Sequence, residues 1–168
     1  FKSFSGGGSV SAIGFSKFDN DNWFVGTTNG RFFRSIDAGQ NWEQTINFLP
    51  EGHYLYGAYI HTSKTDANTL YYMGSGYDNP AVYKSTDGGE TFEEMVDGLP
   101  STLVFKIVSN ADESLLFAAT EAGPYVFVME TQQWHPIAGT CAPNQTYWSV
   151  EYVESLNKIR YGTYGRGI

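Results

Sequence analysis

The side chains of this chain that could do chemistry are mainly acidic and aromatic, and they lie in segments between short apolar runs. An aromatic ring can stack on the apolar face of a sugar ring, while carboxylates accept hydrogen bonds from the sugar hydroxyl groups. An arginine can pair with the carboxylate of a ligand or of a neighbouring part of the protein. We predict as ligand-binding residues Tyr77, Glu121, Tyr147, Trp148, Tyr164 and Arg166. Each aromatic ring could equally pack against a neighbouring part of the fold.

Two carboxylates suggest a catalytic alternative. An inverting glycosidase needs an acid and a base about 6.5–9.5 Å apart. Asp78 and Glu121 lie in corresponding segments of the repeat described below, so Glu121 could be the acid and Asp78 the base that act on a β-glucan-like chain. Glu121 could equally accept backbone N–H groups within its own turn. Hydrolysis is therefore the alternative to non-catalytic binding.

Other chemistries have less support in the sequence. A sialidase needs several arginines that converge on the substrate carboxylate. Of the four arginines in the chain, Arg34 adjoins a turn motif and Arg160 lies in a predicted strand, so at most two can face a common site. The three histidines are dispersed and Cys141 is the single cysteine, so we predict no metal site, no cofactor and no disulfide within the chain.

The composition favours an all-β fold and disfavours some partners. Aromatic residues make up 17% of the chain and charged residues 17%, and there are 19 glycines, which suits short strands and turns. The net charge of −8 disfavours nucleic acid and anionic membranes, because phosphate groups attract clustered Lys and Arg. No apolar run approaches the roughly 20 residues of a membrane helix. Residues 1–4 lack the features of a signal peptide.

One eight-residue pattern occurs twice, with 50 residues between the first positions of the two copies. Both copies have the sequence Ser-x-Asp-x-Gly-x-x-aromatic. Ser and Asp side chains bond to backbone N–H groups within a turn, Gly supplies a positive φ, and the aromatic residue begins the returning strand. We predict structural roles in two tight hairpins for Ser35, Asp37, Gly39, Trp42, Ser85, Asp87, Gly89 and Phe92.

This pattern resembles the Asp box, or BNR repeat, of sialidases, xyloglucanase-like glycoside hydrolases and sortilin-type propellers. In those families the box lies between the third and outermost strands of a blade, away from the ligand-binding face. The resemblance implies a β-propeller in which Asp37 and Asp87 are structural. A third copy has decayed: Phe127 and Met129 replace Ser and Asp, and Trp134 keeps the aromatic position, so we predict a hairpin closed through residues 130–132.

A second repeat has the period of a propeller blade. Apolar runs end in small residues at Gly26, Gly74, Ala119 and Gly162, which are 48, 45 and 43 residues apart. Periods of roughly 40–50 residues are typical of blades. The predicted fold is an all-β propeller of four-stranded antiparallel blades over 9–46, 55–96 and 104–137, with an incomplete blade over 147–168. Residues 1–168 would form about three and a half blades of one domain, and the remainder of the same propeller is the expected partner.

Three segments near the C-terminal end, 118–125, 142–148 and 162–168, resemble the last blades of large sortilin-like (VPS10/BNR) propellers. Those proteins are secreted or displayed on the surface of Gram-negative bacteria, often with a type IX sorting domain after the propeller. The resemblance implies an extracellular or cell-surface protein that holds a peptide, protein or glycan at its channel face without catalysis. The alternative is a xyloglucanase-like glycoside hydrolase whose active site is shared with a missing half.

Overall fold

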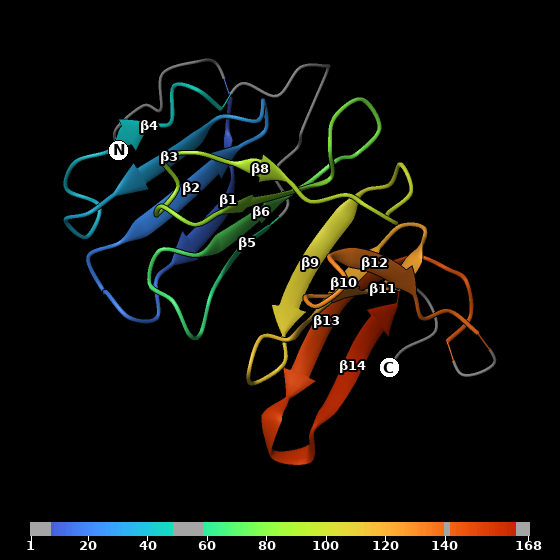
Figure 1. Ribbon diagram of the computed structural model, residues 1–168. Helices are drawn as coiled ribbons and strands as arrows, with labels where there is room; N and C mark the ends of the chain where they lie inside the picture. Colours follow the sequence, from blue (N-terminus) through green and yellow to red (C-terminus); the bar gives the residue numbers. More distant parts are fainter. Residues whose placement is uncertain (1–7, 49–58, 140–141, 164–168) are drawn as a thin grey trace.

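Fourteen strands form four antiparallel sheets in the computed structural model, which describes residues 8–48, 59–139 and 142–163 (Figure 1). Three of these sheets have four strands and the last has two. Each sheet is one blade of a propeller, and successive blades fan out along the chain. The predicted all-β fold, an incomplete propeller of four-stranded blades, is therefore confirmed.

Within each blade the strands are hydrogen-bonded in sequence order. Blade 1 consists of β1 (Val10–Phe15), β2 (Trp23–Thr27), β3 (Phe32–Ser35) and β4 (Glu43–Gln44). Blade 2 consists of β5 (Tyr59–Thr62), β6 (Leu70–Met73), β7 (Val82–Ser85) and β8 (Glu93–Glu94). Blade 3 consists of β9 (Val104–Ser109), β10 (Leu115–Thr120), β11 (Gly123–Val128) and β12 (Gln133–Pro136). Blade 4 consists of β13 (Tyr147–Val153) and β14 (Lys158–Thr163), with the short 3-10 helix η1 (Glu154–Leu156) between them.

The first strands of the blades form the inner side of the arc. Strand β1 packs beside β5, β5 beside β9, and β9 beside β13. The outer strands β4 and β8 have only two residues each. After β4 the chain turns toward the next blade, because the Thr45 hydroxyl donates a hydrogen bond to the Gly89 carbonyl of the second Asp box.

Apolar side chains from facing sheets form a core between each pair of neighbouring blades. Between blades 1 and 2, the rings of Phe32 and Tyr72 lie 5.3 Å apart and both side chains are fully buried. Between blades 2 and 3, Met73 and Ile107 are fully buried. Because successive residues of a strand point to opposite faces, the middle blades contribute to a core on each side. Burial of this apolar surface is the main source of stability.

The small residues that recur at blade spacing have a packing role. Gly26 of β2 lies against the ring of Tyr72 in the next blade, and a Cβ atom at position 26 would be 2.5 Å from Tyr72 Cε2. Ala119 of β10 occupies the corresponding place in blade 3 and belongs to the core shared with blade 4. Small side chains at these positions let a large side chain of the following blade approach the sheet.

Asp-box turns connect β3 to β4 and β7 to β8. In the second turn the Asp87 carboxylate accepts a hydrogen bond from the Ser85 hydroxyl at 2.7 Å and another from the Thr91 backbone N–H at 2.9 Å. The Gly89 N–H donates to Ser85 Oγ at 2.9 Å. Gly89 has φ +87°, and a Cβ atom there would lie 2.7 Å from a ring carbon of Phe32 in blade 1. The turn therefore needs glycine for its backbone conformation and for its contact with the neighbouring blade.

The hairpin of blade 3 closes without an Asp box. The turn between β11 and β12 brings Gln132, at φ 55°, to the end of the loop, and its N–H donates to the Val128 carbonyl at 2.9 Å. The retained aromatic residue, Trp134, is 2% exposed and donates from Nε1 to the Met95 carbonyl of blade 2 at 2.9 Å. In this blade the buried indole anchors the outer strand, whereas the turn itself is closed by backbone hydrogen bonds.

Candidate functional site

Four connecting segments lie together on one face of blades 2, 3 and 4. They are residues 74–81 between β6 and β7, 95–103 between β8 and β9, 121–122 between β10 and β11, and 142–146 before β13. The Gly76 N–H donates to the Thr102 carbonyl at 3.0 Å. The Glu121 N–H donates to the Leu103 carbonyl at 3.1 Å, and the Thr146 hydroxyl lies 3.4 Å from the Glu121 carbonyl. Hydrogen bonds between blades thus hold this face together.

Two of the predicted ligand-binding residues meet on this face. The Tyr77 hydroxyl donates a hydrogen bond to Glu121 Oε2, which joins blade 2 to blade 3, and Tyr77 remains 58% exposed. Asp78 is also exposed, but no hydrogen bond or ion pair joins it to Glu121 among the described residues. The structure pairs Glu121 with Tyr77, and the catalytic roles of Glu121 and Asp78 stay a prediction.

The adjacent aromatic residues Tyr147 and Trp148 of β13 have different environments. Tyr147 is 4% exposed, packs edge-to-face on Tyr161 at 5.4 Å, and donates from its hydroxyl to the Pro143 carbonyl at 2.8 Å. A register shift between Tyr147 and Ser149 interrupts the alternation of the strand, and Trp148 is 51% exposed. Tyr147 is therefore a core residue, which does not support its prediction as a ligand contact, whereas Trp148 keeps the exposure that a ligand contact requires.

Trp148 does not stand alone on the surface. Its ring lies 4.3 Å from the ring of Phe105, with 33° between the two planes. Phe105 belongs to β9 and Trp148 to β13, so this aromatic pair bridges the inner strands of blades 3 and 4. A pair of rings held by two packed strands gives a rigid apolar surface with little conformational entropy to lose on binding.

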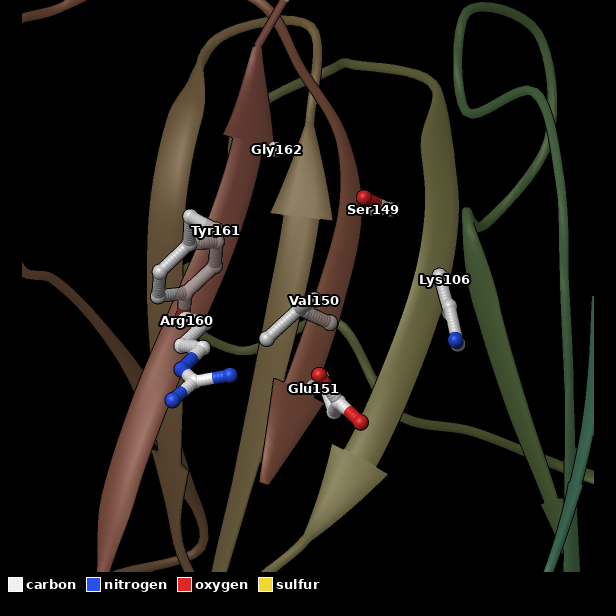
Figure 2. Close-up of a pocket in the computed structure, with 7 residues that line it drawn as sticks. All are labelled: Lys106, Ser149, Val150, Glu151, Arg160, Tyr161 and Gly162. Atoms are coloured by element: carbon white, nitrogen blue, oxygen red, sulfur yellow. The ribbon is translucent and has the colours of Figure 1, made fainter. Parts of the chain in front are cut away.

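A pocket of about 340 Å³ continues from the aromatic pair along the same two strands. Its lining is formed by Lys106 of β9, by Ser149, Val150 and Glu151 of β13, and by Arg160, Tyr161 and Gly162 of β14 (Figure 2). Lys106 directly follows Phe105, and Ser149 directly follows Trp148. The size is at the lower end of the range for small-molecule sites in proteins, about 300–1,000 Å³.

The charged groups of this inner-strand pocket come from three strands. Glu151 and Arg160 are opposite each other in the β13–β14 ladder, and both are exposed. Lys106 places its ammonium group 5.6 Å from the centre of the Tyr59 ring of blade 2. The ion pairs of the described residues all involve Arg34, on another blade, so the three charged groups of the pocket are not paired there. The pocket offers two cations, one carboxylate and the Ser149 hydroxyl.

Gly162 leaves room for the Ser149 side chain in the pocket. A Cβ atom at this position would collide with Ser149 Oγ on the neighbouring strand. With glycine at 162, the Ser149 hydroxyl lies over the ladder and remains exposed. The small residue that the sequence repeat places at 162 therefore has a second consequence in blade 4, where it leaves room for the Ser149 side chain.

Lysines near the inner strands influence a buried histidine. His61 of β5 is 6% exposed. Burial is the main reason why the pKa of His61 falls to about 4, and the positive charges of Lys17, Lys64 and Lys106 lower it as well, while Glu113 acts in the opposite direction. His61 is therefore neutral at pH 7 in the folded protein.

The Asp-box carboxylates, in contrast, are fully engaged in their turns. Burial raises the pKa of Asp87, but hydrogen bonds from Thr91, Ser85 and Glu90 outweigh it and lower the pKa to about 2. The pKa of Asp37 is lowered mainly by the backbone N–H of Asn41. These bonds stabilise the charged carboxylates where they are and give them a structural function.

Sequence reasoning missed most of the inner-strand pocket. Arg160 was set aside because it lies in a strand, but strand alternation places it on the face of the β13–β14 sheet that no described blade covers. Lys106 and Glu151 are the two Lys, Arg, Asp or Glu residues within the four inner strands. The scarcity of charged residues in the inner strands is the sequence feature that could have identified Lys106 and Glu151 as candidates. Tyr164, Arg166 and Cys141 lie outside the described residues.

The described residues contain no group of three or more His, Cys, Asp or Glu side chains placed to hold a metal ion. A search of the same residues for helices long and apolar enough to cross a membrane finds none.

The fold is similar to solved propeller structures. An ancestral GH74 enzyme matches with a TM-score of 0.78 and 16% identity over 94% of this chain. The GH74 enzyme of Niastella koreensis matches with a TM-score of 0.66 and 22% identity over 82% of this chain. YCF48 bound to the D1 peptide matches with a TM-score of 0.63 and 10% identity over 94%. At such identities the similarity shows the fold, an Asp-box-like propeller.

This chain spans only part of each of those proteins: 24% and 22% of the two GH74 chains and 48% of the YCF48 chain. No protein-family model matches the sequence, and no curated protein matches it. The class defined by the fold is therefore an incomplete β-propeller related in structure to GH74 and YCF48 propellers. The narrower assignment to sortilin-like propellers stays a prediction.

Proposed function

We propose that this chain is part of a non-catalytic propeller that binds a glycan at its inner-strand site, formed by Phe105, Lys106, Trp148, Ser149, Glu151 and Arg160. The observation that carries the proposal is the Phe105–Trp148 pair, in which Trp148 is exposed and Phe105 is half-buried, with the two rings 4.3 Å apart next to the pocket. Aromatic rings supply the stacking surface for a sugar ring, and the polar groups that follow along both strands can bond its hydroxyl groups.

The chemistry of the pocket lining distinguishes it from a surface that only another blade would cover. The cores between the described blades are built from buried apolar side chains. The uncovered face of β13–β14 instead presents Ser149, Glu151 and Arg160, all exposed. Burying such charges against an apolar blade would cost free energy. A polar ligand satisfies these groups better.

The remainder of a propeller is the partner that we propose for the opposite end of the arc. On β1, the face that points away from blade 2 exposes Ile13 to 54% and Phe15 to 51%. Ala12 and Gly14, on the other face, pack toward blade 2. Exposed apolar side chains on a sheet face favour contact with a further apolar sheet. A secreted or cell-surface location, as in sortilin-like propellers, accords with a glycan ligand.

We propose binding without hydrolysis for Glu121 as well, because its carboxylate already accepts a hydrogen bond from the Tyr77 hydroxyl. We expect the 168-residue chain to release no new reducing ends from a panel of soluble polysaccharides. Hydrolysis by the wild type together with its loss in Glu121→Gln would establish the glycosidase alternative instead.

The test of glycan binding compares two exposed apolar residues of blade 4. Trp148 is 51% exposed beside the pocket, and Leu156 is 52% exposed in η1 at the other end of the blade. A glycan array identifies a ligand, and calorimetry measures its affinity for the wild type, Trp148→Ala and Leu156→Ala. Loss of one stacking ring should weaken binding about tenfold, and Leu156→Ala should bind as the wild type does. Equal affinities of all three proteins, or no bound glycan, would refute the proposal.

A further inference from the structure

We infer that the ligand of the inner-strand pocket carries a carboxylate, and that the site takes a uronic acid or another acidic sugar. This inference rests on the proposed function and adds the class of sugar. A uronic acid has an apolar ring face, hydroxyl groups and one carboxylate. Each of these features has a counterpart among the described side chains of the pocket and the adjoining aromatic pair.

The charge balance of the pocket favours an anion. The pocket lining contains two cationic side chains, Lys106 and Arg160, and one carboxylate, Glu151. Its net charge is therefore +1. The contact between Lys106 and the Tyr59 ring holds the lysine side chain along the inner side of the arc. An arginine and a lysine on rigid strands can bind a carboxylate with charge-assisted hydrogen bonds.

The surroundings of the pocket reinforce this preference. Lys17 and Lys64 lie close enough to the inner strands to affect His61, as Lys106 does. Lys64 donates to the Ser109 carbonyl at 3.1 Å and lies over the ring of Tyr152, and the Glu113 carboxylate accepts from the Lys64 backbone N–H at 2.8 Å. The lysines near the inner strands would attract an anionic ligand, and Glu113 offsets part of their charge.

The remaining groups favour a sugar over an acidic peptide. Trp148 and Phe105 provide a ring surface beside the cations. Glu151 can accept a hydrogen bond from a sugar hydroxyl group. Ser149 can donate to or accept from the same hydroxyl groups. One carboxylate per ring, with hydroxyls beside it, matches this arrangement.

The experiment uses the 168-residue chain, an oligogalacturonide and the same oligosaccharide after reduction of its carboxyl groups. We expect the acidic form to bind at least tenfold more tightly at low salt, and this preference to shrink as NaCl is added. Arg160→Gln should lower affinity for the acidic form about tenfold and leave the reduced form unchanged. Lys158→Gln, on the same strand but outside the pocket lining, is the matched control and should have little effect.

The outcomes separate the two proposals. Equal binding of the acidic and reduced oligosaccharides would overturn the acidic-sugar inference and leave glycan binding standing. No binding of these probes and no hit on the glycan array would overturn both. Tighter binding of poly-glutamate than of the oligogalacturonide would show that the site takes an acidic peptide. Circular dichroism of Arg160→Gln checks that the fold is intact, and Lys106→Gln provides a second, independent removal of a pocket cation.

Discussion

The Asp-box turns and the inner-strand pocket are both rich in polar groups, but the groups differ in whether they have partners. In the second box Asp87 accepts hydrogen bonds from its own turn, and the first box is closed in the same manner around Asp37. In the pocket, Glu151 and Arg160 are exposed and form none of the described ion pairs. A polar group with all its partners inside the fold contributes stability. One without them is available to a ligand.

The largest effect that we expect concerns the buried His61 on the inner side of the arc. Because the folded-state pKa of His61 is about 4, below its ordinary value of 6.5, unfolded chains bind a proton that folded chains do not as pH falls through this window. The free energy of unfolding should therefore fall by up to about 3 kcal/mol between pH 6.5 and pH 4. Urea titrations of the wild type and His61→Gln measure this. A slope in the variant as steep as in the wild type would contradict the assignment.

A smaller loss of stability is expected in the turns. Asp87→Ala removes the acceptor of the Thr91 and Ser85 hydrogen bonds and should lower the free energy of unfolding by about 1–2 kcal/mol. Glycan affinity should not change. Glu151→Ala is the counterpart in the pocket and should change stability by less than about 0.5 kcal/mol. Chemical denaturation gives both values. Equal losses of stability in Asp87→Ala and Glu151→Ala would contradict the difference that we infer between the Asp-box turns and the pocket.

The pH dependence of stability below pH 5 tests the same difference between the Asp-box turns and the pocket. The pKa of Asp87 is lowered from 3.8 to about 2 in the folded protein, so its stabilising effect is complete above 3.8 and disappears as pH falls toward 2. Asp87→Asn should lack this part of the pH dependence. Unfolding midpoints between pH 5 and pH 2 provide the measurement, with Glu151→Gln as a control that should follow the wild type.

The smallest effect concerns the carboxylate of the pocket. Glu151→Gln keeps an acceptor oxygen for a hydroxyl group but removes the negative charge, so affinity for an acidic oligosaccharide should rise about threefold, or roughly 0.6 kcal/mol. Affinity for the reduced oligosaccharide should stay as it is. Calorimetry at low salt resolves a change of this size, and weaker binding of the acidic form would argue against repulsion by Glu151.

The candidate site contains features that sequence patterns do not predict, above all the exposure of individual side chains. Trp148 and Tyr147 are adjacent aromatic residues in one strand, and no feature of the sequence separates them. In the structure Tyr147 lies in the core between blades 3 and 4 and is 4% exposed, whereas Trp148, the next residue of the strand, is 51% exposed. The same limit applies to Arg160, because its availability depends on which face of the last sheet has a neighbour. The bond between Glu121 and Tyr77 likewise emerges only from the packing of two blades.

The amino-acid sequence by itself determined the all-β propeller, the repeat of the blades and the two tight turns. These depend on local chemistry: Ser, Asp and Gly at fixed spacing, and aromatic runs that end in small residues. Only the tertiary structure decided which polar groups lack partners and lie together, because Lys106, Glu151 and Arg160 reach one pocket from three strands of two blades. Local pattern specifies a turn or a strand, whereas a site depends on how separate strands pack.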